Sequence, residues 1–300
     1  MGSQRRADGR AFTAVHPASS WIVRRLPPRT LLLLTFIIPV RHHANSRDWP
    51  QLVAYLRETV GSLERQECAE WRCVIVANEG SELPSFSSRV TIHRVDFPPN
   101  PHHDPGSTDL ESFRDAVRLD KGRRVLAGMR RAGPTDYFMT VDDDDYVSSR
   151  VAGFVAQARG EPGWFLRDGY VWTTGGRLLY RHDNFNHYCG TSHIVRRDLF
   201  DLGVGDDEAG VAYVKKMLGS HIAIAETLAR SGTPLLQLPF PGAVYRIGHA
   251  NAHSQSPSLL RHFLLNRSRL TNPRSLLLSL RRFRLRTVRA NREFFGSAAG

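Results

Sequence analysis

Four consecutive carboxylates at residues 142–145 are the part of the sequence best suited to chemistry. They directly follow the apolar run YFMTV at 137–141, whose aromatic and β-branched residues are typical of a buried strand. Adjacent carboxylates repel one another, and a divalent cation relieves that repulsion; oxygen ligands suit Mg²⁺ or Mn²⁺. An acidic turn or a helix N-cap is the alternative. Because a solvated turn needs no buried strand in front of it, we favour a metal site.

Basic and imidazole side chains elsewhere in the chain suit the same site. Guanidinium and ammonium groups bind phosphate oxygens, which makes Arg41, Lys121, Arg123 and Arg246 candidate phosphate ligands. His249 is a candidate metal ligand, because imidazole accepts Mn²⁺. Two alternatives stay open: the basic run that begins at Lys121 also fits a solvated helix face, and His249 also fits a surface histidine.

The segments around these residues alternate between strand and helix patterns. Such alternation predicts an α/β fold with a mostly parallel sheet, whose ligands bind at the carboxyl ends of the strands. The second half of the chain predicts a hairpin and further short strands. We expect strands at 30–40, 71–77, 90–95, 137–141, 188–195, 234–238 and 243–247, a hairpin at 164–181, and helices at 49–63, 120–132, 211–218 and 221–230.

Charge divides the chain into three parts. The net charge is +12, yet residues 1–30 carry +5 and residues 261–300 carry +9, so the body of the chain is close to neutral. We expect a disordered basic leader at 1–30, a folded domain at 31–255 and an amphipathic helical tail rich in Arg and Leu at 256–300. A basic apolar helix at 258–295 suits peripheral contact with an anionic membrane, and a solvated helix is the alternative. A body without a basic face argues against nucleic acid.

Two further features bear on location. The apolar run at 31–40 is ten residues long, which is too short to span a membrane. Cys68, Cys73 and Cys189 are few and widely spaced, so neither a disulfide framework nor a zinc site is expected. We therefore expect a cytoplasmic protein, with peripheral contact at the inner face of the membrane.

Several motifs in order carry a resemblance to a known family. They are FIIPVR at 36–41, VIVANEG at 74–80, DKGRRVLAG at 120–128, VDDDD at 141–145, GTSHIVRRDLF at 190–200 and VYRIGHANAHS at 244–254. Residues 34–254 resemble a family 2 glycosyltransferase of GT-A fold, with a DXD-type acidic motif. The resemblance implies a Rossmann-like central sheet flanked by helices, with a smaller antiparallel sheet on the acceptor side. It also implies transfer of a sugar from a nucleoside diphosphate, with UDP favoured, to a glycan or lipid-linked acceptor in cell-surface polysaccharide synthesis.

The same resemblance assigns roles to individual residues. The family's catalytic base is an Asp in a Glu-Asp pair, where this chain has Ser220 and His221, so His221 is the expected base. The carboxylates at 206–208 are the alternative. Asp168, beside the aromatic residues of the predicted hairpin, is expected to bind sugar hydroxyls. The implied metal ligands are Asp142, Asp144, Asp145 and His249, and the implied nucleotide-sugar ligands are Pro39, Arg41, Asn78, Glu79, Lys121, Arg123, Asp142, Asp143 and Arg246.

Two other functions compete with sugar transfer. A nucleotidyltransferase shares the sheet and the acidic site, but it usually needs a Gly-rich loop after the first strand, and PVRHHANSRDW at 39–49 contains no Gly. A catalytically inactive relative that binds a membrane or a protein partner is the other candidate. The family usually has paired aspartates where this chain has Asn78 and Glu79, and this departure favours the inactive reading.

Overall fold

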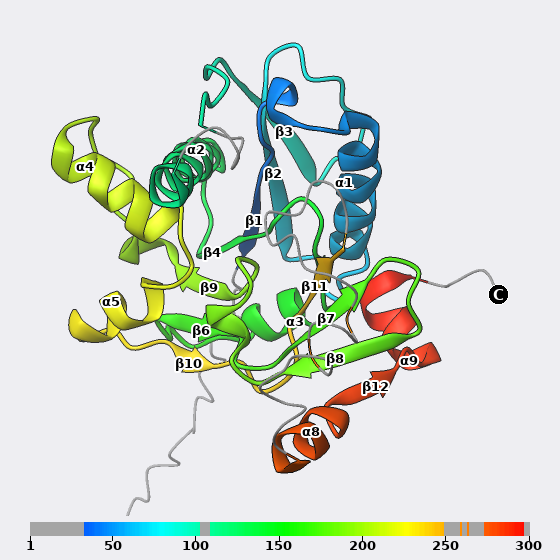
Figure 1. The fold of residues 1–300 in the computed structure, drawn as a ribbon. Coiled ribbons are helices and arrows are strands. Elements are labelled where there is room, and N and C mark those ends of the chain that lie inside the picture. The colour runs from blue at the N-terminus through cyan, green and yellow to red at the C-terminus, as the bar shows by residue number, and fades with distance from the viewer. Residues whose placement is uncertain (1–32, 103–108, 249–258, 260–262, 264–272, 297–300) are drawn as a thin grey trace, which may run out of the picture. The chain divides into compact units, whose positions relative to one another are not determined.

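A seven-stranded mixed sheet carries the acidic segment in the computed structural model, which describes residues 33–102, 109–248, 259, 263 and 273–296 (Figure 1). Four neighbouring strands are parallel; the strand next to them runs antiparallel, and the two strands beyond it run in the same direction as the first four. The order is β10 (Leu236–Gln237), β6 (Gly163–Phe165), β9 (His193–Arg196), β4 (Tyr137–Thr140), β1 (Leu34–Pro39), β2 (Trp71–Asn78) and β3 (Val90–Val95). The expected α/β class and mostly parallel sheet are therefore confirmed. The predicted leader at 1–30 lies outside the described residues.

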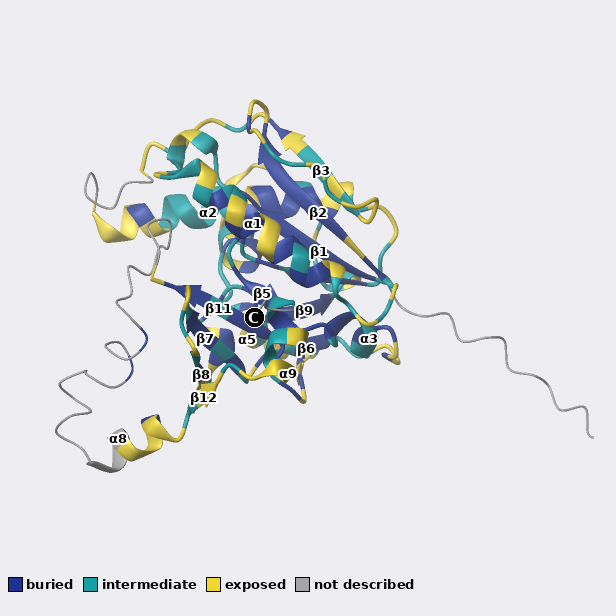
Figure 2. Cartoon of the chain, turned by 90° about the vertical axis from the view of Figure 1, so that its right-hand side faces the viewer, coloured by how far each residue is buried: buried dark blue, intermediate teal, exposed yellow. Residues whose placement is uncertain are grey.

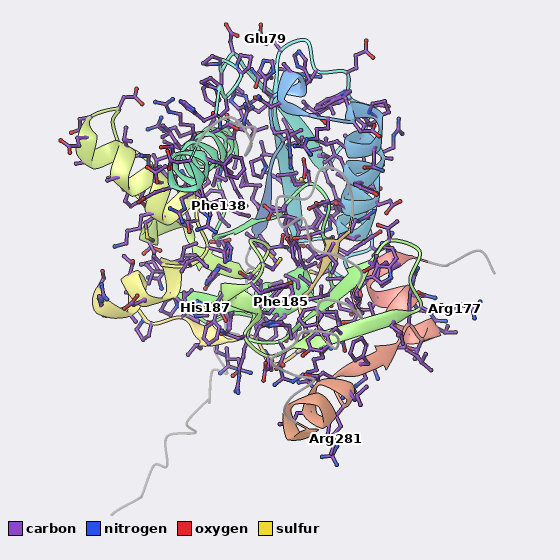
Figure 3. The ribbon with its side chains drawn as sticks, viewed as in Figure 1. Glu79, Phe138, Arg177, Phe185, His187 and Arg281 are labelled. Carbon is purple, nitrogen blue, oxygen red and sulfur yellow. The ribbon has the colours of Figure 1, made fainter. Side chains whose placement is uncertain are left out.

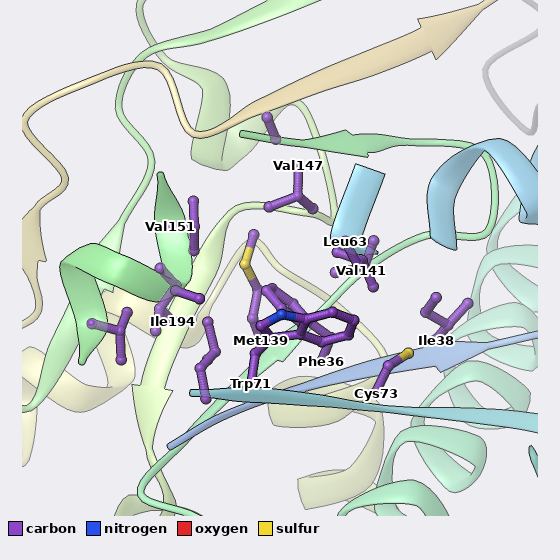
Figure 4. Packing of buried hydrophobic residues seen from close by; sticks show 14 of the residues in the cluster. Phe36, Ile38, Leu63, Trp71, Cys73, Met139, Val141, Val147, Val151 and Ile194 are labelled. Atoms are coloured by element: carbon purple, nitrogen blue, oxygen red, sulfur yellow. The ribbon is translucent and has the colours of Figure 1, made fainter. Parts of the chain in front are cut away.

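Two long helices, α1 (Trp49–Glu64) and α2 (Leu110–Arg131), cover opposite faces of the parallel strands (Figure 1). Alternate side chains of a strand point to opposite faces, so Phe36 and Ile38 join the apolar cluster of α1 while Ile37 joins that of α2. Figure 4 shows the α1-side cluster at close range, and Figure 2 shows that the buried residues concentrate on the strands. Burial of each such side chain contributes about 1.5–3 kcal/mol.

A second, five-stranded sheet follows the acidic segment in the chain. Its order is β12 (Phe283–Leu285), β8 (Leu178–His182), β7 (Gly169–Thr173), β11 (Ala243–Ile247) and β5 (Tyr146–Val147). The small sheet was expected to be antiparallel, but it is mixed, because β11 runs parallel to β7. Since β4 belongs to the large sheet and β5 to the small one, residues 141–145 are the connection between the two sheets.

Several predicted boundaries were wrong. Helix α2 begins ten residues before the predicted start, because Asp109 caps it by accepting hydrogen bonds from the amides of Glu111 and Ser112. The predicted hairpin begins at β7, and Trp164 belongs to β6 of the large sheet. The tail is not one helix, because β12 separates two helices and pairs with β8. Among the described residues, the further α-helices with defined bounds are α3 (Val151–Val155), α4 (Glu208–Tyr213), α5 (Ile224–Arg230), α8 (Pro273–Leu280) and α9 (Val288–Ala290), and a π-helical turn follows α4 at Val214–Leu218. No helix within the described ranges has both the length and the apolar character to cross a membrane.

Candidate active site

A pocket of about 400 Å³ lies at the carboxyl ends of β1 and β4. Pro39 ends β1, Arg41 follows it, and residues 142–144 follow β4. Helix α2 and the loop at 219–222 supply further walls, and Tyr188, Gly190 and Tyr245 complete the lining. The pocket therefore occupies the edge of the sheet at which α/β proteins bind ligands.

Thr191 holds the acidic turn, residues 142–145, through two hydrogen bonds. The Thr191 hydroxyl accepts a hydrogen bond from the amide of Asp142 at 2.9 Å and donates one to the carboxylate of Asp145 at 2.6 Å. Asp145 is fully buried, and it does not line the pocket, although it was a predicted metal ligand. Burial, together with the charges of Asp144 and Asp142, raises the pKa of Asp145 well above its usual range. Asp142, Asp143 and Asp144 line the pocket, while Asp145 anchors the turn.

Lys121 on α2 forms an ion pair with Asp142 across the pocket. Burial lowers the pKa of Lys121, but the Asp142 carboxylate more than offsets this effect, so the pKa lies above its ordinary value. Gly190 lies directly against the pair: a Cβ atom there would be 2.5 Å from Asp142 Oδ2 and 2.8 Å from Lys121 Nζ. The absence of a side chain at Gly190 therefore leaves room for the ion pair.

The wall made by α2 is cationic. Arg114, Arg118 and Lys121 all line the pocket, and their spacing of four and three residues places them on one helical face. Together with Arg41, which follows β1, these three side chains bring positive charge to Asp142, Asp143 and Asp144. Arg114 and Arg118 were not predicted, because the expected helix began at residue 120; their helical spacing from Lys121 was the available signal.

Asn78 contributes indirectly, through Arg124. The buried guanidinium of Arg124 donates to Asn78 Oδ1 at 2.7 Å and pairs with Asp120 at 2.9 Å. Asn78 also donates to the carbonyl of Phe97 at 2.6 Å, and it does not itself line the pocket, whereas Arg124 does. The predicted nucleotide ligand is therefore a residue that orients a pocket arginine.

The loop at 219–222 brings His221 to the pocket. Gly219 lets this loop approach α2, because a Cβ atom there would be 1.9 Å from the Arg118 carbonyl oxygen. Gly122 on α2 lets the preceding π-helical turn approach, because a Cβ atom there would be 2.6 Å from the Val214 carbonyl oxygen. His221 was expected to head a helix, but α5 begins three residues later, at Ile224. Its ring is therefore in a loop rather than at a helix N-terminus.

His221 is uncharged at neutral pH. Burial and the nearby charge of Lys121 lower its pKa to about 4, against an opposing effect of Asp142. His193 on β9 is its neighbour; burial, reinforced by repulsion from His221 once that ring is protonated, lowers the pKa of His193 to about 3. Both rings line a second cavity of about 20 Å³, and the Nε2 atom of each has no hydrogen-bond partner among the described residues. Two neutral imidazole rings therefore lie beside the cavity that Lys121, the cation of the Lys121–Asp142 ion pair, also lines.

Arg246 lies behind the acidic turn rather than in the pocket. Its fully buried guanidinium donates to Glu58 Oε2 at 2.5 Å, to the Tyr146 hydroxyl at 2.5 Å and to the Asp144 carbonyl oxygen at 3.0 Å. Its backbone amide donates to Asp145 at 3.2 Å. Arg246 was predicted to bind phosphate, but these contacts give it a role in holding the turn against β11.

Three other predicted residues do not line the pocket. Asp168 pairs with Arg181 on the neighbouring strand at 3.1 Å and does not line the pocket. Glu79 is exposed in the loop after β2 (Figure 3), and Arg123 is exposed on α2; neither lines the pocket. His249 lies outside the described residues.

No model of a known protein family matches this chain, and no curated protein matches it. The chemistry is therefore argued from the pocket alone. Within the part of the chain that the structure describes, no group of three or more His, Cys, Asp or Glu side chains is arranged to hold a metal ion unaided. The pocket offers carboxylate oxygens from the acidic turn, which face cationic side chains from α2; the Asp120 carboxylate of α2 also lines the pocket and is paired with Arg124.

Proposed function

We propose that this protein is a metal-dependent glycosyltransferase of GT-A type. It moves a sugar from a nucleoside-diphosphate donor, with UDP favoured, to a glycan or lipid-linked acceptor in cell-surface polysaccharide synthesis. One observation carries the proposal: the three carboxylates of residues 142–144 and a row of cationic side chains on α2 line the same pocket at the carboxyl ends of parallel strands. Carboxylates are ligands for a divalent cation, and cationic side chains bind the phosphate oxygens of a diphosphate.

The donor set of the acidic turn fits Mg²⁺ or Mn²⁺. Such ions are usually bound by one or two carboxylates together with phosphate oxygens of the substrate, rather than by a cage made only of protein. Asp142 and Asp144, both partly exposed in the pocket, are the ligands we assign. A bound cation supplies positive charge that stabilises the departing diphosphate.

The chain's own cations and His221 supply the remaining roles. Lys121, Arg118 and Arg41 bind phosphate oxygens of the donor. His221 accepts the proton of the acceptor hydroxyl, because its ring is neutral and lines the pocket. An anionic diphosphate beside Lys121 offsets the charge that lowers the pKa of His221, and so makes the imidazole a stronger base when the donor is bound.

The pocket also offers a surface for the acceptor. Leu110 and Ile222 line it although 58% and 48% of their surfaces are exposed, and Tyr188 and Tyr245 add aromatic rings. Exposed apolar side chains beside a polar site suit the hydrocarbon part of a lipid-linked acceptor. A cytoplasmic location agrees with Cys68, Cys73 and Cys189, which are all free thiols.

The test is a thermal-shift panel of UDP, GDP, CMP and dTDP, each with and without Mn²⁺. A ligand that binds only the native state raises the melting temperature. We expect one nucleotide to stabilise the protein only with metal, and Asp144→Ala to lose that response. Asp96→Ala, an exposed aspartate outside the pocket, is the matched control and keeps the response.

The same panel distinguishes the competing function. Stabilisation by none of the nucleotides, in a protein that melts cooperatively, contradicts the transferase and favours an inactive relative. Stabilisation that is equal with and without Mn²⁺ contradicts the metal site at Asp142 and Asp144.

A further inference from the structure

The tail exposes an unusual number of apolar side chains. Eight large hydrophobic residues of the described chain are exposed, and five of them fall within residues 277–288. Leu285 and Val288 are 70% and 74% exposed, and Figure 2 shows α9 and the coloured part of α8 largely in the colour of exposed residues. We call this region the tail surface; its apolar residues are Leu277, Leu278, Leu280, Leu285 and Val288.

The same stretch is strongly basic. Residues 277–292 contain six arginines and no Asp or Glu. Arg282 pairs with Asp183, and Arg286 stacks on Phe295 with its guanidinium carbon 4.0 Å from the ring centre. The others, Arg281, Arg284, Arg289 and Arg292, are exposed, and Figure 3 shows Arg281 projecting away from the ribbon beside α8. Exposed aliphatic side chains and exposed arginines are therefore interspersed along the tail surface.

The tail surface has a fixed base on the folded domain. Strand β12 pairs with β8, and Phe283 packs against Tyr180 with ring centres 5.2 Å apart. Farther along, Phe294 is buried, and the carbonyl of Phe294 accepts a hydrogen bond from Arg65 at 2.8 Å. The surface is thus held at two points by the body of the protein, and it is not the free helix that the sequence suggested.

We propose that the tail surface docks on a membrane leaflet rich in anionic lipid. Arginines attract acidic headgroups, and the leucine and valine side chains enter the boundary between headgroups and acyl chains. A second copy of this chain is a poor occupant, because the like charges of two tail surfaces repel. Nucleic acid is also a poor occupant, because the exposed rings that stack on bases are replaced here by aliphatic side chains.

The test is co-sedimentation of the full chain with vesicles, without nucleotide or metal. Vesicles of phosphatidylcholine alone are compared with vesicles that also contain phosphatidylglycerol, at low and at high salt. We expect binding only to the anionic vesicles, weakened by salt. The variant Arg281→Gln/Arg284→Gln/Arg289→Gln is expected to lower the partition coefficient about 100-fold, at about fivefold per arginine. The variant Leu277→Ser/Leu278→Ser is expected to lower it about tenfold.

Matched variants outside the tail surface serve as controls. Arg230→Gln and Leu236→Ser each change an exposed residue far from α8 in sequence, and they leave vesicle binding unchanged. Equal binding to both kinds of vesicle, binding that ignores salt, or tail variants that bind like the wild type overturns the proposal. The salt series needs no variant, so it decides the question even if a variant fails to fold. Because no donor is present, the result is independent of the sugar-transfer assignment.

Discussion

The hydroxyl of Thr191 donates a hydrogen bond to the carboxylate of Asp145 over 2.6 Å, although both side chains are fully buried. The same oxygen accepts a hydrogen bond from the amide of Asp142. Thr191, in the loop that precedes β9, therefore fixes both ends of the acidic turn. A buried polar group that loses its partner costs about 1–3 kcal/mol, and more if it is charged. The position of the candidate metal ligands therefore depends on a residue that touches no ligand.

We predict that Thr191→Val destabilises the protein by about 3 kcal/mol, because it leaves the Asp145 carboxylate and the Asp142 amide each without this partner. Urea denaturation measures the change. Thr191→Ser keeps the hydroxyl and loses one methyl group, so we expect a loss of only about 1 kcal/mol. Equal losses for the two variants would show that the hydroxyl is not what holds the turn.

We predict that Gly190→Ala damages the site more than the fold. Its new Cβ atom displaces Asp142 Oδ2 and Lys121 Nζ, which are the ends of flexible side chains, so stability changes by less than about 1 kcal/mol. Disturbing a charge-assisted contact weakens metal-dependent nucleotide binding by about tenfold. Isothermal titration measures the affinity. Gly153→Ala, in the short helix α3 outside the pocket, is the control and leaves the affinity at the wild-type value.

We predict that His221→Ala removes sugar transfer but keeps nucleotide binding. The imidazole is the proton acceptor in our assignment, and loss of a general base lowers turnover by about 10²–10⁴-fold. Donor consumption with a suitable acceptor measures turnover, and the thermal shift with nucleotide measures binding. Turnover that survives in His221→Ala would assign the proton transfer to another group.

We predict that the two buried histidines lower stability in acid. The pKa of His193 is about 3 and that of His221 about 4 in the native protein, against 6.5 for an unperturbed side chain. Between these values the unfolded chain binds more protons, so their contribution to stability is fully present above pH 6.5 and is lost as pH falls towards 4. Each histidine adds a slope of up to about 1.4 kcal/mol per pH unit.

Asp145 acts in the opposite sense, so a variant is needed to isolate the histidines. Its raised pKa means that the native protein takes up a proton before the unfolded chain does, which favours the native state as pH falls. We expect chemical denaturation of His193→Asn to show a shallower loss of stability between pH 6.5 and 4 than the wild type. Parallel curves for the two proteins would mean that His193 does not carry the effect.

The strands near the pocket were predictable from the sequence, because their apolar runs are short, rich in β-branched residues and closed by polar loops. β3 and β11 begin and end at the predicted residues, and the carboxyl ends of β1, β2 and β4 each lie one residue from the predicted end. The acidic turn could be placed at the end of β4 for the same reason, and residues 142–144 do line the pocket.

The residues that were misjudged depend on contacts between distant parts of the chain. Arg246 fits a phosphate ligand by type, yet its partners Glu58 and Tyr146 lie 188 and 100 residues away, and no local pattern announces them. Asp145 looks like its three neighbours in sequence, and its distant partners Cys189, Thr191 and Arg246 reveal that it faces inward. The strand β12 is hidden in a run of Arg and Leu that by composition fits a helix better.

The residues that hold the acidic turn lie in segments that are synthesised at different times. During synthesis on the ribosome, residues 142–145 emerge well before Thr191, and about a hundred residues before Arg246. Until β11 has emerged, the Asp145 carboxylate lacks the Arg246 amide and the Asp144 carbonyl lacks the Arg246 guanidinium that donate to them in the folded protein. Contacts of such long sequence separation form late, after the entropy of closing the intervening loops has been overcome. The candidate site is therefore assembled near the end of folding, and a nascent chain that stops short of residue 246 presents no finished pocket.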